Sequence, residues 1–139
     1  MFGTLVHAIL RDVPVKASLE EIRALAAVHA RITSADAAET TAAAACASAV
    51  LKHKVWRAAS SAAAMHREMP VTMHLAGGRV LEGVLDLAYK DTGGWVVVDY
   101  KTDADLEVNR DVYVRQLRWY LHTLAMATGE PVRGILLQV

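Results

Sequence analysis

Apolar residues recur at helical spacing through the first half of the chain. A short helix is expected over 4–11, and Ser18 with Glu21 has the form of a capping box that opens a second helix. The stretch 37–65 is dominated by alanine, serine and threonine, which favours helix with a break near His53. The same low complexity is also compatible with partial disorder of this stretch.

The second half changes to the alternation that is typical of strands. The expected elements, in order, are a strand over 71–75, a strand over 79–89, a strand that begins at 95, a helix over 109–127 and a strand over 132–139. The long helix can act as a crossover, so the last strand is predicted to lie parallel to the strand before it. The pattern therefore predicts an α/β fold with a mixed sheet of about four strands flanked by helices.

Two acids and a lysine fall at one end of a predicted hairpin. If Lys90 faces Trp95 across the turn, Asp86 lies opposite Asp99, and alternation puts Lys101 on the same face. Directly opposed side chains are about 5 Å apart at Cβ. Two carboxylates at that distance repel by about 3 kcal/mol at an effective dielectric constant of about 20. A divalent cation reverses the sign of this term, so the pair predicts a Mg²⁺ or Mn²⁺ site.

The alternative for the same residues is a pair of solvated strand acids with Lys101 as a surface ion-pair partner. Against it, Asp99 follows the apolar run 95–98, which is typical of a buried strand, where an unpaired acid is costly. Beside a cation, the Lys101 ammonium would polarise water or stabilise charge on a phosphate.

Glu68 is a second-tier candidate for the metal site. A two-residue turn at Gly77-Gly78 makes paired positions sum to 155, which puts Glu68 opposite Leu87 and on the wrong face for Asp86. It reaches the metal only if Pro70 forces a bulge.

On the helix over 109–127, Tyr113 is interpreted as a core aromatic residue whose hydroxyl contacts water.

These segments together resemble the PD-(D/E)xK nuclease superfamily, and within it the RecB-like exonuclease domain found at the C-terminus of RecB and AddA helicase-nucleases. The segments that carry the resemblance are Gly3 to His7, Glu68-Met-Pro70, Gly83-x-x-Asp86, Asp99-Tyr100-Lys101-Thr102, Gln116-x-x-x-Tyr120 and the closing strand from Pro131. They span nearly the whole chain. The resemblance implies a single domain over 1–139 with a restriction-endonuclease-like core.

The resemblance also implies roles for individual residues. The implied metal ligands are His7, Asp86, Asp99 and the backbone carbonyl of Tyr100, the implied catalytic lysine is Lys101, and Gln116 and Tyr120 line the site from the following helix. The expected activity is Mg²⁺- or Mn²⁺-dependent hydrolysis of DNA, as an exonuclease, in DNA repair or recombination. DNA is the expected partner, with a helicase subunit or a parent polypeptide as a further one.

Composition sets limits on these expectations. The formal net charge is zero, so DNA contacts must come from local basic clusters, namely Lys52, Lys54, Arg57 and Arg67, or Arg110, Arg115 and Arg118. A single cysteine, Cys46, forms no intramolecular disulfide and cannot ligate an iron–sulfur cluster, which favours the reducing cytoplasm. No apolar run has the length of a membrane span, and a P-loop motif is absent from the sequence, which excludes ATP hydrolysis by a P-loop mechanism.

Two other functions stay open. One is a catalytically weak DNA-end or protein-binding module of the same fold, because the helical region between His7 and Glu68 is compact for the group. The other is a fragment of a larger helicase-nuclease that is active only with its parent.

Overall fold

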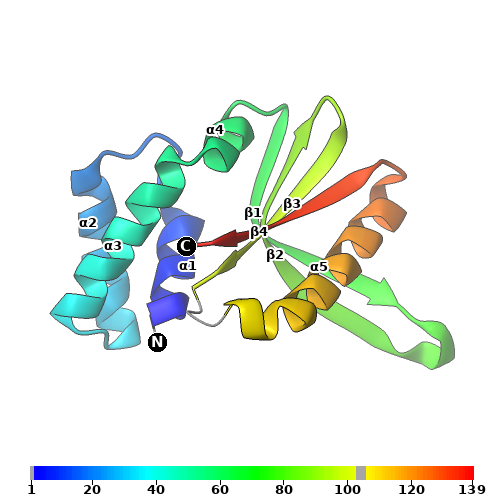
Figure 1. Ribbon diagram of the computed structural model, residues 1–139, viewed down its shortest axis with the longest axis horizontal. Coiled ribbons are helices and arrows are strands. Elements are labelled where there is room, and N and C mark those ends of the chain that lie inside the picture. Colours follow the sequence, from blue (N-terminus) through cyan, green and yellow to red (C-terminus); the bar gives the residue numbers. More distant parts are fainter. Residues whose placement is uncertain (1, 103–105) are drawn as a thin grey trace.

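A computed structural model describes residues 2–102 and 106–139 and shows helices on both sides of one sheet (Figure 1). The elements, in chain order, are α1 (Phe2–Asp12), α2 (Leu19–Thr33), α3 (Ala37–Lys52), α4 (Lys54–Ser60), β1 (Ala64–His74), the 3₁₀ turn η1 (Ala76–Gly78), β2 (Val80–Asp91), β3 (Gly94–Lys101), α5 (Leu106–Thr128) and β4 (Val132–Gln138). Helices α1 to α4 gather on one side of the sheet and α5 covers the other.

The sheet is mixed, as the sequence predicts. Its strand order is β1-β2-β3-β4, in which β1, β2 and β3 are antiparallel neighbours and β4 lies parallel to β3. Helix α5 is the crossover between the two parallel strands, because a parallel pair cannot be joined by a tight turn. The described part of the chain thus has the predicted α/β architecture.

Local signals placed most helix boundaries correctly. The capping box at Ser18 is present: the Glu21 carboxylate accepts from the Ser18 backbone at 2.7 Å, and the Ser18 hydroxyl accepts from the Glu21 backbone at 3.2 Å. The break near His53 is also present, since His53 has extended backbone angles and caps α4 through its ring nitrogen.

The start of the sheet was predicted wrongly. Helix was expected to continue to residue 65, but α4 ends at Ser60 and β1 begins at Ala64, seven residues before the expected strand. Residues 64–67 pair with 87–90 of β2, so hydrogen bonding to a long neighbouring strand outweighs the local preference of an alanine-rich segment.

Two hydrophobic cores lie on the two faces of the sheet. The larger one lies between α1 to α4 and the strands, and its fully buried members include Leu5, Ile9, Trp56, Leu87 and Val98. The smaller one lies under α5 and contains the following buried residues: Leu85, Ala88, Val97, Leu117 and Leu124. No helix among the described residues is both long and apolar enough to cross a membrane.

Arg67 attaches the end of α1 to β1. Its Nη1 donates to the backbone carbonyls of Leu10 at 3.1 Å and Val13 at 2.5 Å, and the guanidinium lies 5.8 Å from the ring centroid of Trp56. These carbonyls have no further helical donors, because they lie at or beyond the last turn of α1. Arg67, which the sequence grouped with possible DNA contacts, is therefore occupied inside the fold.

We expect Arg67→Lys to lower the free energy of unfolding by about 2 kcal/mol, because an ammonium lacks the planar fork and the stacking surface of the guanidinium. Urea denaturation of the metal-free protein measures this. Arg57→Lys, at an exposed position on α4, is the matched control and should change stability little. An equal loss for both variants would contradict the role given to Arg67.

Candidate active site

Helix α1 presents His7 to the sheet. Gly3 lies one turn earlier on the same side of the helix and approaches the end of β3 so closely that an added Cβ would lie 2.6 Å from Thr102 Oγ1. Glycine at this position therefore lets α1 sit against the segment Asp99 to Thr102. The His7 ring packs edge-on to Tyr100, with centroids 6.0 Å apart.

The β2–β3 hairpin has the predicted register. Lys90 pairs with Trp95, and the ladder continues to Leu87 opposite Val98, which places Asp86 at the level of Asp99. Beyond that pair, the Asp86 carboxylate takes the place of a strand carbonyl: its Oδ2 accepts from the Tyr100 backbone N–H at 2.7 Å. Its Oδ1 lies 3.1 Å from His7 Nδ1. One side chain thus links α1, β2 and β3.

Glu68 lies at the level of Asp86, which corrects the register expected for the first hairpin. The turn is the three-residue η1 rather than two glycines, so paired positions sum to 154, with Arg67 opposite Leu87 and Met69 opposite Leu85. The extra turn residue shifts the whole ladder by one position. The shift removes the reason for placing Glu68 on the wrong face.

The β1–β2 pair also changes face at this point. Leu87 packs in the core under α1 to α4, whereas Leu85, two residues earlier, packs in the core under α5. Regular alternation would put both on one face. Glu68 has a left-handed backbone with φ of 50°, a conformation that is rare for a non-glycine residue inside a strand. The reversal frees Glu68 and Asp86 from the ladder and turns both toward α1.

Together these features make a compact donor cluster. Ligand atoms of His7, Glu68 and Asp86 all lie within 4.8 Å of one another. They line an open hollow of about 450 Å³, together with Gly3, Thr4, Ala8 and Arg11. The cluster is therefore within reach of solvent and of a large substrate.

The electrostatics of the cluster reflect burial and crowded negative charge. Burial, and then repulsion from Asp86, raises the pKa of Glu68. Burial likewise raises the pKa of Asp99, and Lys101 offsets only part of this rise. The hydrogen bond to Asp86 raises the pKa of His7. Burial is the main cause of the shifts at Glu68 and Asp99, and repulsion from Asp86 adds to both; a cation bound between the acids would offset that repulsion.

Asp99 and Lys101 form a buried ion pair beside the cluster. The Lys101 Nζ lies 2.8 Å from Asp99 Oδ2, and only 15% and 5% of the two side chains are exposed. Asp86 and Asp99 also repel each other through space. The two acids and the lysine thus meet at one end of the hairpin, which excludes the surface ion-pair alternative.

A family comparison decides what kind of protein carries this arrangement. The model of the PD-(D/E)XK nuclease superfamily matches residues 1–139. The chain belongs to this superfamily. Its sheet and flanking helices are those of the restriction-endonuclease-like fold that the sequence predicted for it.

Curated relatives of this nuclease chain are subunits of larger enzymes. It is 34% identical over 118 residues to an ATP-dependent helicase/nuclease subunit of Geobacillus kaustophilus, and 33% identical over 118 residues to the protein of the same name from Geobacillus thermodenitrificans. Each match covers 73% of this chain and 9% of the relative. The chain thus corresponds to a small part of these proteins, consistent with a RecB-like nuclease domain.

The donor set fits a divalent cation. One imidazole and two carboxylates within 4.8 Å supply the nitrogen and oxygen ligands that such ions take, and a cation between the carboxylates would relieve the repulsion of Glu68 by Asp86. Glu68, ranked second by sequence, lies inside this cluster, while Asp99 and the Tyr100 backbone border it.

Gln116 and Tyr120 lie together farther along α5. The Gln116 amide donates to the Tyr120 hydroxyl at 2.9 Å, and the Tyr120 ring packs so tightly on Gly83 that a Cβ there would lie 2.5 Å from it. Both line a second hollow of about 200 Å³ with Trp119. Lys101 is instead contacted from α5 by Tyr113, whose ring centroid lies 4.5 Å from Nζ. In the sequence, Tyr113 precedes Gln116 by three residues, which places the two on neighbouring positions of one helix face; this spacing was the signal that could have pointed to Tyr113.

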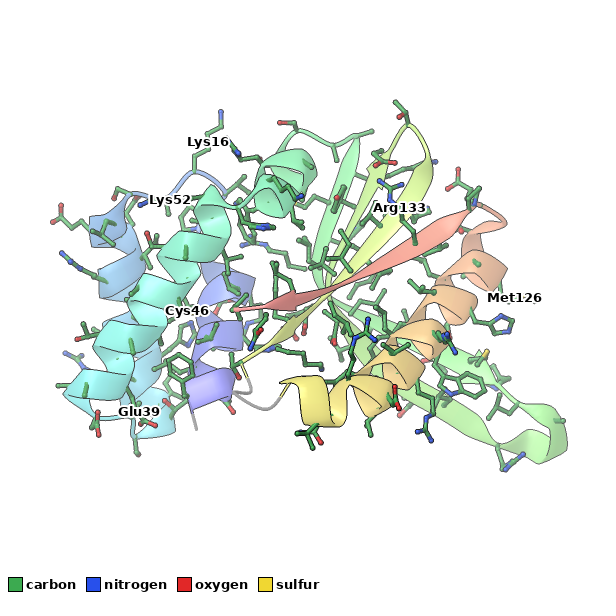
Figure 2. All side chains as sticks on the ribbon, in the orientation of Figure 1. Lys16, Glu39, Cys46, Lys52, Met126 and Arg133 are labelled. Atoms are coloured by element: carbon green, nitrogen blue, oxygen red, sulfur yellow. The ribbon has the colours of Figure 1, made fainter. Side chains whose placement is uncertain are left out.

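The basic clusters lie outside the donor hollow. Lys52 and Arg57 line a different hollow of about 360 Å³ with Lys16, between α2, α3 and α4. Figure 2 shows Lys16 and Lys52 beside α4, at the end of the helical layer opposite the start of α1. On α5, Arg110, Arg115 and Arg118 are exposed.

The strained backbone at Glu68 predicts that replacing this residue with glycine raises stability relative to glutamine while activity is lost. Glu68→Gly should raise the free energy of unfolding of the metal-free protein by about 0.5–1 kcal/mol above that of Glu68→Gln, because glycine adopts the left-handed conformation without steric cost. Both variants lack the carboxylate and should lose nuclease activity. Urea denaturation and a DNA digestion assay measure the two effects. If the glycine variant is no more stable than the glutamine variant, the backbone at residue 68 is not strained.

Proposed function

We propose that the chain is a divalent-metal-dependent deoxyribonuclease that digests DNA from its ends. The observation that carries the proposal is the gathering of His7, Glu68 and Asp86 within 4.8 Å at an open hollow, next to the buried pair of Asp99 and Lys101. Acids held this close repel each other, a cation between them reverses the sign of that interaction, and the superfamily to which the chain belongs is named for its nucleases.

In this proposal His7, Glu68 and Asp86 hold Mg²⁺ or Mn²⁺, and Asp99 and the Tyr100 carbonyl complete the site. The bound cation would supply an activated water and stabilise the leaving oxygen of the phosphodiester. The protein's own contribution is to orient the ligand side chains. The Tyr100 N–H fixes one oxygen of Asp86, which leaves the carboxylate a defined direction toward His7 and the hollow.

Lys101 is the proposed electrostatic catalyst. Its ammonium is held by Asp99 at the edge of the site and would stabilise negative charge that develops on the scissile phosphate. Gln116 and Tyr120, with Trp119 beside them, would contact the DNA strand as it passes the β1–β2 hairpin, because an exposed amide and aromatic rings suit a backbone and its bases.

The names of the relatives support a proposal about the wider role of the chain. Their names describe ATP-dependent helicase/nuclease subunits, and the chain spans about 9% of their length. These names support the proposal that the chain works in DNA repair or recombination, with a helicase of the same or another polypeptide. The competing function is a binding module of the same fold without efficient catalysis.

Asp99→Ala and Lys101→Ala should separate metal binding from chemistry. We expect Lys101→Ala to reduce cleavage by about 10²–10³-fold while Mn²⁺ binding persists, and Asp99→Ala to weaken both. Calorimetric Mn²⁺ titration and digestion of labelled DNA measure the two properties. Lys90→Ala, whose ammonium pairs with Glu130 on the surface, is the matched control. Metal-dependent cleavage that survives in purified Asp99→Ala protein would refute the assignment.

Digestion of end-labelled linear DNA and closed circular DNA should differ. With Mg²⁺ or Mn²⁺ we expect loss of the linear form only, and with EDTA loss of neither, because the proposed activity needs both a cation and an end. Cleavage of both forms would contradict the exonuclease assignment. Metal-independent gel shifts without DNA loss would favour the binding module.

A further inference from the structure

Lys101 is held from two sides by different kinds of group. On the strand side, its Nζ lies 2.8 Å from Asp99 Oδ2. On the helix side, the same nitrogen lies 4.5 Å from the centroid of the Tyr113 ring, a distance at which a cation is attracted to an aromatic face. The side chain is only 15% exposed, so water competes weakly with either contact.

The Asp99 carboxylate alone does not fix the position of the Lys101 ammonium. A lysine side chain has a flexible four-carbon stem and a compact charge, so its direction depends on its partners. Asp99 also adjoins Asp86 and the donor cluster, and a carboxylate that shares its charge with a cation attracts the ammonium less. An aromatic ring attracts an ammonium without neutralising its charge or taking its proton.

We infer that Tyr113 is a positioning residue, whose ring face keeps the Lys101 ammonium in place when the Asp99 carboxylate is engaged by the metal site. This inference rests on the proposed nuclease function and goes beyond it. It also separates two groups of residues on α5. Tyr113 acts on the lysine, whereas Gln116 and Tyr120, one and two turns later, bond to each other and pack on Gly83.

The placement of Tyr113 follows from the fold. Helix α5 crosses from the end of β3 to the start of β4, so its early turns pass over the carboxyl end of β3, where Lys101 lies. Leu117, one turn after Tyr113, is buried under the same helix against Gly134 of β4 and fixes the rotation of α5. A rigid helix can therefore hold the ring at a defined position relative to the strand.

A spectroscopic test addresses the contact without requiring activity or metal. The chain has five lysines, so the Hε–Cε signals of a metal-free sample can be assigned with a Lys101→Arg variant. A ring face over the ammonium shifts the Lys101 Hε signal upfield. We expect this shift to persist in Tyr113→Phe, which keeps a ring, and to disappear in Tyr113→Leu. An unchanged signal in Tyr113→Leu would overturn the inference.

Kinetics then test the consequence for catalysis. Tyr113→Leu should lower kcat about tenfold, equivalent to about 1.4 kcal/mol, with KM unchanged, because the lysine acts on the transition state more than on binding. Tyr113→Phe should stay within about twofold of the unaltered chain, since a ring face suffices. Val112→Ala, at an exposed position on the same turn, is the matched control and should leave kcat unchanged.

The outcomes distinguish this inference from the proposed function. Equal loss of kcat in the phenylalanine and leucine variants would assign the effect to the hydroxyl and overturn the inference. A rise in KM with unchanged kcat would do the same, because it indicates a role in DNA binding. If the unaltered chain lacks metal-dependent cleavage, the proposed function fails and the catalytic role of Tyr113 fails with it, while the upfield Hε shift still reports whether the ring contact exists.

Discussion

The carboxylate of Asp86 is the point on which the site depends. It bonds to the Tyr100 backbone with one oxygen and to the His7 ring with the other, and thereby joins β2, β3 and the first helix. A carboxylate can replace a strand carbonyl as an acceptor only where the ladder has ended, and the last β2–β3 pair, Leu87 with Val98, lies directly next to Asp86 in the sequence. The end of β2–β3 pairing and the gathering of the donor side chains therefore have the same structural cause.

The left-handed backbone of Glu68 allows the donor side chains to gather. The left-handed turn of Glu68 lets the β1–β2 pair change face, so that one end of the pair contributes to the core under α1 to α4 and the other end to the core under α5. Two acids leave regular pairing at the reversal and are partly buried, which raises the pKa of Glu68. Such a combination of strain and crowded charge lowers stability, and it is typical of functional sites.

Helix α5 combines an architectural and a chemical role. A parallel neighbour for β3 requires a long crossover, and that crossover must pass over the end of β3 that carries Lys101. The same helix therefore covers the second core, brings the Tyr113 ring to the lysine and packs Tyr120 against Gly83 on the hairpin. Side chains of one rigid helix can in this way act at two places along the sheet.

The sequence by itself determined the features that short-range physics controls. The capping box at Ser18, the break at His53, the register of Lys90 with Trp95 and the mixed sheet with its crossover helix all follow from turn residues and periodicity. These signals also brought Asp86, Asp99 and Lys101 to one end of a hairpin. Only the tertiary structure decided that β1 begins at Ala64, that Glu68 joins His7 and Asp86, and that Tyr113 faces Lys101. The first depends on hydrogen bonds from β2, the second on a one-residue change in a turn and a left-handed backbone, and the third on the packing of α5, none of which leaves a periodic trace in the sequence.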